Sequence, residues 1–295
     1  MNFDRIGFIG FGEAGHILAS DLAARNIHVQ AYDLLLDKQA TRQDMEKMAD
    51  RCGVRLCASA TEAAQDTTLV ISAVTAGNAL QVARALAPSL RPGQIFMDIN
   101  SVAPATKQAA RDAVEGRGAR YIDAAVMAPV PPQRLMTPIL LSGQAPTELS
   151  AVLNSLGFNT REVGSAVGVA SAIKMCRSVM IKGLEALTTE CLNTAHHYGA
   201  ETEVLASLHA SFPSMGWDAN LPHYLISRVA EHGRRRAEEM QEVAQTVQAA
   251  GVQPSMSLAI AQTQLSLVEA MTERGLEYKD LEPFDWQQLH TLLRV

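Results

Sequence analysis

The sequence predicts an α/β domain, with a doubly wound and mostly parallel sheet, followed by an all-α domain. Over residues 5–163, short apolar runs alternate with helical patterns, which is typical of parallel strands covered by helices on both faces. From Ser165 to His197 there is no proline, and apolar residues recur at helical spacing. Such a helix would be roughly 50 Å long at 1.5 Å per residue. We therefore place one domain at residues 1–163 and a second at 164–295, joined by this long helix.

The first predicted strand, residues 5–9, leads directly into a glycine-rich turn. Its sequence is Gly10-Phe11-Gly12-Glu13-Ala14-Gly15, the pattern G-x-G-x-x-G, and a helical pattern follows. Gly10 permits a tight turn, Gly12 lets a pyrophosphate approach the backbone, and Gly15 lets the helix lie close to the strand. The amides at the start of that helix attract phosphates. We expect a Rossmann dinucleotide site at these six residues.

A carboxylate at the end of the second predicted strand indicates which dinucleotide binds. Asp33 follows the strand at 27–32, where it can accept hydrogen bonds from the ribose hydroxyls and repel a 2′-phosphate. Leu34 comes next rather than an arginine, so we favour NAD, with NADP as the alternative. Ligands of such folds bind at the carboxyl ends of strands. The end of the strand at 68–74 should therefore lie under the cofactor, at Ala73, Val74 and Thr75, although Thr75 could equally belong to an ordinary loop.

The other elements follow from the same patterns. Residues 129–132 hold three prolines, which predicts a stiff loop over 127–134 outside the sheet. Pro104 should begin a helix capped by Asn100 or Ser101. Further strands are expected at 54–58, 94–99, 121–126, 137–142 and 158–163. Further helices are expected at 35–50, 61–64, 76–87, 146–155, 201–209, 217–231, 233–250 and 255–270.

Composition argues against several classes of protein. The net charge of −6 gives no reason to expect binding to nucleic acid or to a membrane. No run of 18 uncharged apolar residues is present, and Asp4 and Arg5 stand where a signal peptide would begin. The four cysteines lack metal-binding spacing, so we expect no metal and reduced, mostly buried thiols in a cytoplasmic protein.

Four segments resemble the β-hydroxyacid dehydrogenases, the group of 3-hydroxyisobutyrate, tartronate semialdehyde and 6-phosphogluconate dehydrogenases. The first is the glycine-rich turn. Residues 98–104, Asp-Ile-Asn-Ser-Val-Ala-Pro, are similar to the substrate motif D-x-S-T-x-x-P, and residues 123–129 match the start of D-A-P-V-S-G-G. Residues 164–174 resemble the segment G-x-G-x-x-x-K. Residues after about 182 look like the branch whose carboxyl-terminal domain has no known function.

The resemblance implies that Lys174 is the catalytic lysine and that Asn100 and Ser101 hold the substrate, with Asn100 also beside the cofactor. Three departures affect the substrate pocket. Where the family has S-G-G, this chain has Met127, Ala128 and Pro129, and proline has no amide to donate. Ser178 replaces the asparagine that follows the lysine, and Ile181 replaces a glutamate that serves as an acid in 6-phosphogluconate dehydrogenase.

These features predict an NAD(P)-dependent oxidoreductase that acts on the CH–OH group of a small hydroxy acid or on its aldehyde or keto form. Lys174 would be the general acid/base, its pKa lowered by the apolar neighbours Ile173 and Met175. An imine reductase and a non-catalytic NAD(P)-binding protein remain alternatives. Lys182 and Glu185 share the face of Lys174, but a solvated stripe in which they pair is the simpler interpretation. We also expect a homodimer, as in the family.

Overall fold

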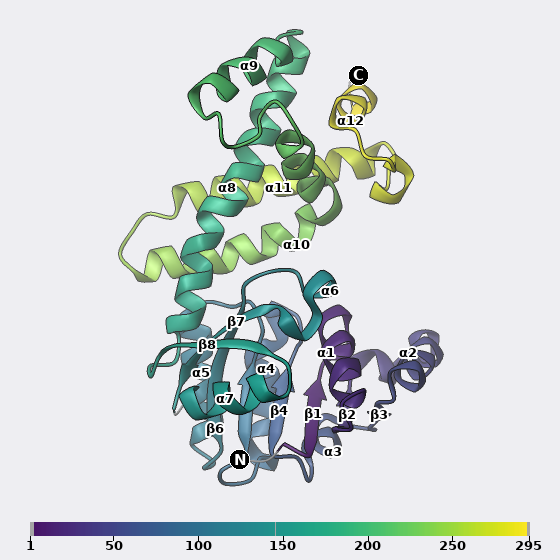
Figure 1. The fold of residues 1–295 in the computed structure, drawn as a ribbon, viewed down its shortest axis with the longest axis vertical. Coiled ribbons are helices and arrows are strands. Elements are labelled where there is room, and N and C mark those ends of the chain that lie inside the picture. Colours follow the sequence, from purple (N-terminus) through teal and green to yellow (C-terminus); the bar gives the residue numbers. More distant parts are fainter. Residues whose placement is uncertain (1–2, 145, 294–295) are drawn as a thin grey trace. The chain divides into compact units, whose positions relative to one another are not determined.

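The computed structural model describes residues 3–144 and 146–293. It contains two compact units that divide between Lys174 and Met175. The division falls inside helix α8 (Val169–His197), which begins in the first unit and continues into the second (Figure 1). The sequence placed the boundary at 163/164, before this helix.

The first unit is built on an eight-stranded sheet of order β3-β2-β1-β4-β5-β6-β7-β8. Neighbouring strands are parallel except for β6 and β7, so the predicted doubly wound, mostly parallel fold is confirmed. The order reverses between β1 and β4, which is where such sheets bind ligands. The strands are β1 (Arg5–Ile9), β2 (His28–Tyr32), β3 (Arg55–Leu56), β4 (Leu69–Ser72), β5 (Ile95–Asp98), β6 (Arg120–Val126), β7 (Pro138–Gly143) and β8 (Asn159–Gly164).

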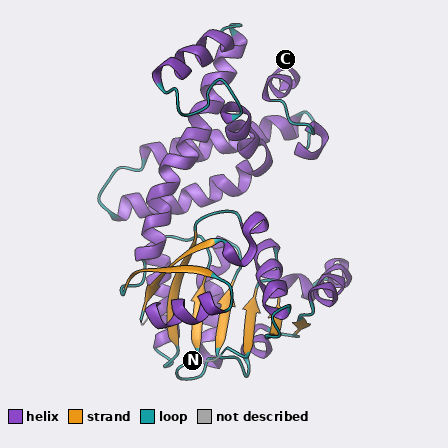
Figure 2. Ribbon diagram, in the orientation of Figure 1, coloured by secondary structure: helices purple, strands orange, loops and turns teal. Residues whose placement is uncertain are grey.

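Helices cover both faces of this sheet (Figure 2). One face packs against α1 (Glu13–Ala23), α2 (Gln39–Cys52) and α7 (Pro146–Ser155), and the other against α3 (Ala60–Ala64), α4 (Ala79–Leu86) and α5 (Pro104–Glu115). Successive residues of β4 alternate between the two cores, with Ile71 in the first and Val70 in the second. This explains why the first three residues of the strand, 69–71, are all apolar. Single turns of 3₁₀ helix occur at Leu34–Asp37 (η1), Ala76–Asn78 (η2), Ala87–Ser89 (η3) and Arg134–Met136 (η4).

Two local predictions in the first unit are wrong. The proline-rich segment is not loop throughout, because Val130–Gln133 forms the short helix α6 with proline in its first turn. Proline is tolerated there because the amides of a first turn have no partner within the helix. Helix α5 does begin at Pro104, but Ala103 is its N-cap and no side chain caps it. Asn100 and Ser101 are therefore left for other contacts.

The second unit contains only helices among its described residues. After α8 come α9 (Glu201–Ser211), α10 (Leu221–Ala249), α11 (Ser255–Glu273), the 3₁₀ turn η5 (Tyr278–Leu281) and α12 (Trp286–Leu293). The two helices predicted at 217–231 and 233–250 form a single helix, α10. Gly233 does not break it, since it lies where α10 crosses α11, and a β-carbon there would be 2.3 Å from the carbonyl oxygen of Gln264.

Two expectations from composition can be compared with the structure. Among residues 3–144 and 146–293, no helix is long and apolar enough to cross a membrane. All four cysteines are free thiols, but Cys176 and Cys191 are exposed and only Cys57 is fully buried. The expectation of mostly buried thiols is therefore wrong.

Candidate functional site

The glycine-rich turn between β1 and α1 has a close-packed side and an open side. A β-carbon at Gly10, whose φ is 99°, would lie 2.2 Å from the carbonyl oxygen of Ala73, and one at Gly15 would lie 2.3 Å from that of Gly10. At Gly12, by contrast, a β-carbon would have no atom within 4 Å. No side chain caps the start of α1. This open backbone at a helix N-terminus is the arrangement that accommodates a pyrophosphate.

Asp33 lies beside this turn, at the end of β2. Its carboxylate accepts a hydrogen bond from the amide of Phe11 at 2.8 Å and another from the amide of Leu35 at 2.9 Å. These two bonds hold the carboxylate against the glycine-rich turn. The carboxylate therefore lies beside the glycine-rich turn, at the carboxyl end of β2.

Asn100 joins the carboxyl ends of β4 and β5. Its side-chain oxygen accepts from the amide of Val74 at 2.7 Å, and its side-chain nitrogen donates to the hydroxyl of Ser72 at 3.0 Å. Asn100 is buried, and the hydroxyl of Thr75 accepts from Asn78 at 2.9 Å. Ala73, Val74 and Asn100 thus form a rigid edge next to Gly10.

Lys174 and Ser101 meet although they are distant in the sequence. The Lys174 Nζ donates to the Ser101 Oγ at 2.5 Å. Ser101 follows β5, Lys174 lies in the second turn of α8, and both belong to the first unit. Ile173 does not provide the expected apolar shielding, because its side chain is exposed.

A buried lysine that the sequence analysis did not select lies behind this pair. The Lys107 Nζ is 2.9 Å from Oδ1 of Asp98, donates to the Asp98 carbonyl oxygen at 2.7 Å, and is 3.6 Å from Oδ1 of Asp123. Tyr121 donates its hydroxyl to Asp98 at 2.6 Å, and burial, followed by the Asp98 charge, raises the pKa of Tyr121 well above its usual value. The sequence feature that could have revealed Lys107 is its position on the apolar face of α5, in line with Ala110 and Val114.

Asp123 anchors the first turn of α8. Its carboxylate accepts from the amides of Gly168 and Ser171, both at 3.1 Å, and from the Ser171 hydroxyl at 2.6 Å. The Ser142 hydroxyl accepts from the amide of Ala170 at 3.1 Å. The start of the helix that carries Lys174 is therefore bound to the sheet through polar groups of β6 and β7.

The segment that replaces S-G-G offers few donors. The amide of Met127 donates to the carbonyl of Pro138 at 2.9 Å, and Pro129 has no amide hydrogen. The Met127 side chain packs on a cluster formed by Ala125, Leu140 and Ala170. We call residues 127–129 the apolar wall, because the Met127 side chain is apolar and neither Met127 nor Pro129 has a free amide donor.

Lys182 and Glu185 do not form the solvated stripe that we expected. Both are buried in the second unit, where Lys182 Nζ lies 2.6 Å from a carboxylate oxygen of Glu239. Glu185 pairs with Arg236 at 2.7 Å and accepts from Gln264 at 3.1 Å. Burial lowers the pKa of Lys182 and raises that of Glu185. Ser178 lies on α8 of the same unit, one turn after Lys174.

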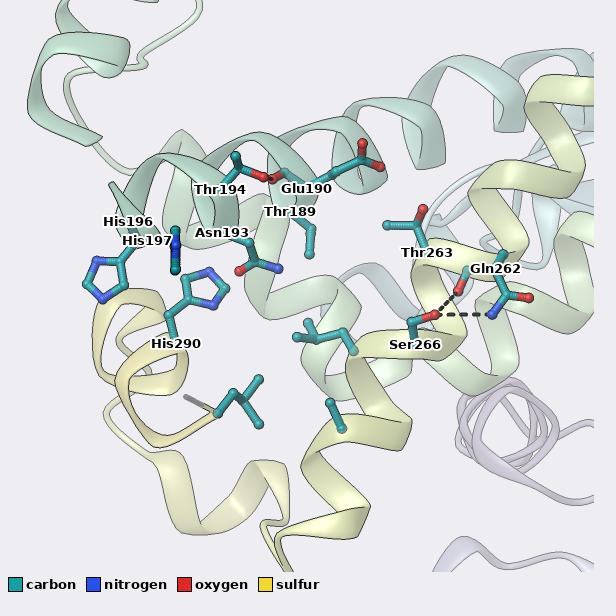
Figure 3. Close-up of a pocket in the computed structure, with 13 residues that line it drawn as sticks. Thr189, Glu190, Asn193, Thr194, His196, His197, Gln262, Thr263, Ser266 and His290 are labelled. Carbon is teal, nitrogen blue, oxygen red and sulfur yellow. Dashed lines mark hydrogen bonds between the residues drawn. The ribbon is translucent and has the colours of Figure 1, made fainter. Parts of the chain in front are cut away.

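The second unit also contains a groove of about 530 Å³, shown in Figure 3. Residues of α8, α11 and α12 line it, among them Asn193, His196 and His290. It contains none of the residues predicted for the site. Within the described part of the chain, no cluster of three or more histidine, cysteine or acidic residues could hold a metal ion.

The open glycine-rich turn and the carboxylate beside it define the first unit as a dinucleotide-binding domain. Residues 5–164 match the NAD binding domain of 6-phosphogluconate dehydrogenase, and residues 195–267 match a domain of unknown function, DUF1932. The chain therefore belongs to the β-hydroxyacid dehydrogenase family, in the branch with this carboxyl-terminal domain, and its cofactor is NAD(P).

Three relatives are similar to this chain over most of its length. A conserved hypothetical protein from Sinorhizobium meliloti is 36% identical, with 98% of this chain and 95% of that chain aligned and a TM-score of 0.78. An uncharacterised 28.5 kDa protein from Methanothermus fervidus is 29% identical over 85% of this chain and 94% of its own length. Mitochondrial 3-hydroxyisobutyrate dehydrogenase from Drosophila melanogaster is 25% identical over 73% of this chain, and the match spans 66% of that enzyme.

Proposed function

We propose that the protein is an NAD-dependent oxidoreductase that interconverts a small hydroxy acid and its aldehyde or keto form, with Lys174 as general acid/base. The observation that carries this proposal is the 2.5 Å contact between Lys174 Nζ and Ser101 Oγ at the carboxyl end of β5. An amine there lies at the edge of the sheet where ligands of this fold bind. The relatedness to 3-hydroxyisobutyrate dehydrogenases supports the substrate class.

The residues fit a bound dinucleotide. The backbone at Gly12 is open, so the pyrophosphate can lie against it. The backbone of Phe11, Glu13 and Ala14 would surround the phosphates. Asp33 would bind the adenosine ribose, which favours NAD over NADP. Ala73, Val74, Thr75 and Asn100 would lie beneath the rest of the cofactor. When bound, NAD supplies the hydride acceptor.

Lys174 would move the proton that accompanies the hydride. In the oxidation direction a neutral Nζ takes the proton of the substrate hydroxyl while the C–H bond of the carbon that bears this hydroxyl breaks. In the reduction direction the ammonium gives the proton back to the substrate oxygen. Ser101 orients the amine. The substrate would be held by Asn100, Ser101, Met127, Ala128 and Ser178.

Replacing Lys174 with alanine tests this proposal. With 3-hydroxyisobutyrate, glycerate and L-serine as a substrate panel, we expect kcat for the accepted acid to fall by at least about 10²-fold, the usual contribution of a general acid/base. Binding of NAD, measured as a rise in melting temperature, should stay the same. Lys47→Ala, on the surface of α2, is the matched control. Unchanged turnover in Lys174→Ala would refute the assignment.

The apolar wall favours a second candidate, reduction of an imine. At Met127 and Pro129 fewer backbone amides are available to bind a substrate carboxylate than the S-G-G segment would offer. Cyclic imines tested beside the hydroxy acids, at fixed NADH and NADPH, separate the two activities. If no compound of either panel turns over while NAD raises the melting temperature, the protein is a non-catalytic NAD-binding protein.

We further propose a homodimer and a cytoplasmic location. Apolar side chains on α8, Met180 and Leu187, are more than half exposed and share one helix face, which supports a partner subunit. The exposed thiols of Cys176 and Cys191 fit a reducing compartment, where free cysteines persist.

A further inference from the structure

We propose that Lys107 is a positioning residue for the reaction. Together with Asp98 and Asp123 it holds the first turns of α8 on the sheet, and so holds the Lys174 amine against Ser101. The inference rests on the proposed function for what the amine does, but the positioning itself can be measured without a substrate.

The two carboxylates need a cation between them. Asp98 and Asp123 are register partners on the adjacent parallel strands β5 and β6, and both are buried. Like charges directly opposite each other on neighbouring strands repel, and the repulsion grows in a poorly solvated interior. The ammonium of Lys107, itself 0% exposed, lies 2.9 Å from one carboxylate and 3.6 Å from the other. Its positive charge therefore offsets the repulsion between the two carboxylates.

On its other side, Asp123 contacts hydrogen-bond donors of the α8 start. The carboxylate accepts from two backbone amides of the α8 start and from the Ser171 hydroxyl. A carboxylate at a helix N-terminus is also favoured by the helix dipole. The two backbone amides share one oxygen of Asp123, and the other oxygen faces Lys107 Nζ. An asparagine has only one acceptor oxygen, so its N–H groups would meet either the backbone amides or the Lys107 ammonium, and at least one contact would be lost.

The network connects both partners of the candidate catalytic contact. Asp98 ends β5, and its Oδ1 accepts from the amide of Asn100 at 2.9 Å, immediately before Ser101. Asp123 holds Ser171, and Lys174 lies three residues further along α8 on a neighbouring position of the same face. Lys107 thus connects the strand that carries the hydroxyl with the helix that carries the amine. Buried ion pairs contribute little net stability, so a role in geometry is the better explanation for this one.

The test compares Lys107→Met and Asp123→Asn with the unchanged protein, all with NAD present. We expect amide hydrogen exchange at residues 168–174 to accelerate at least about tenfold as this turn opens locally. The rate of reductive methylation of Lys174, followed by mass spectrometry, should change at least about threefold because its contact with Ser101 loosens. Lys47 provides the reference rate within each sample.

A rescue variant separates positioning from general damage. In Lys107→Met/Asp98→Asn the repulsion is gone and Asp123 keeps its charge, so slow exchange at 168–174 should return. Val114→Ala is the matched control, because Val114 is a buried, apolar residue of the same helix and contributes no charge or hydrogen bond to the network. It should lower the melting temperature without affecting either measurement at α8.

If Lys107→Met does not fold, the milder Ser171→Ala, which removes one bond to Asp123, should give the same changes to a smaller extent. Unchanged exchange at 168–174 and unchanged labelling of Lys174 in the folded variants would overturn the proposal. If both change but the unaltered protein turns over no substrate, the positioning stands and the proposed function fails.

Discussion

Glu185 is an ionisable side chain buried among helices of the second unit. Burial is the largest influence on it and raises its pKa, although Arg236 acts in the opposite direction. The folded protein therefore keeps the proton to a higher pH than the unfolded chain does. Below the ordinary value of 4.5 both states are protonated, and above it the unfolded chain ionises first. This group alone makes the free energy of unfolding decrease as the pH rises above 4.5 toward the raised value.

Replacing Glu185 with glutamine should remove that decrease. We compare the free energy of unfolding of the unaltered protein with that of Glu185→Gln. Relative to the variant, the unaltered protein should be less stable at about pH 7 than at about pH 5, because the carboxyl group titrates and the amide does not. Urea titrations at the two pH values measure it. The exposed Glu190→Gln on the same helix serves as the control. A difference that grows with pH would show that the ion pair with Arg236 outweighs burial.

The crossing of α10 and α11 explains why a glycine, Gly233, lies inside one long helix where the sequence predicted two. Alanine is normally favoured over glycine inside a helix by about 1 kcal/mol. At Gly233 the β-carbon would lie 2.3 Å from a backbone oxygen and 2.6 Å from the Val268 side chain, so the two helices would have to move apart. The packing requirement exceeds the intrinsic preference at this position.

Gly233→Ala should therefore destabilise the protein by about 1–3 kcal/mol, the usual cost of overpacking. Gly183→Ala in α8 is a matched comparison, because its β-carbon would make only an ordinary contact at 3.4 Å with Ile260. We expect that variant to be neutral or to gain up to about 1 kcal/mol. Thermal and urea unfolding of both variants measure the contrast, and equal effects would contradict this explanation.

The elements that sequence predicted well are those whose signal is local. Strands β1, β4, β5 and β7 contain apolar runs bounded by turn residues, and the glycine-rich turn combines spacing with a following helix. What was missed depends on contacts between distant segments. The opposing backbone at Gly233 and the acidic partners of Lys107 come from other elements, and the burial of Lys182 depends on α10. Helix periodicity alone does not reveal which neighbour a face will meet.

The site was predicted unevenly for the same reason. Lys174 and Ser101 were selected through the family motifs, and the structure brings them together. The desolvation expected from Ile173 was wrong, because a one-dimensional pattern does not tell whether an apolar side chain is covered. Asp98 and Asp123 were recognised only because they match positions of the family motifs. Their contacts show that Asp98 binds Lys107 and that Asp123 binds the start of α8.

At the scale of the whole molecule, the exposed face of α8 bears on assembly. Met180 and Leu187 are 66% and 57% exposed and seven residues apart, so they share a face of the helix. Burying such side chains fully would contribute about 1.5–3 kcal/mol each. A second copy of this chain is the partner that symmetric assembly favours.

The double variant Met180→Glu/Leu187→Glu should shift the protein from dimer to monomer in sedimentation equilibrium, because charges would replace the apolar contact. The melting temperature extrapolated to low protein concentration should change little, since neither side chain belongs to a core. Lys38→Glu, at an exposed site of the first unit, controls for added charge. A monomer in the unaltered protein, or a dimer that survives the double change, would contradict the assignment.

The division of the chain at Lys174 has an evolutionary consequence. Amine, hydroxyl, carboxylate anchors and glycine-rich turn are all encoded before residue 175. Recombination downstream of that codon would exchange the helical unit and leave the Lys174–Ser101 contact and the glycine-rich turn together on one uninterrupted segment.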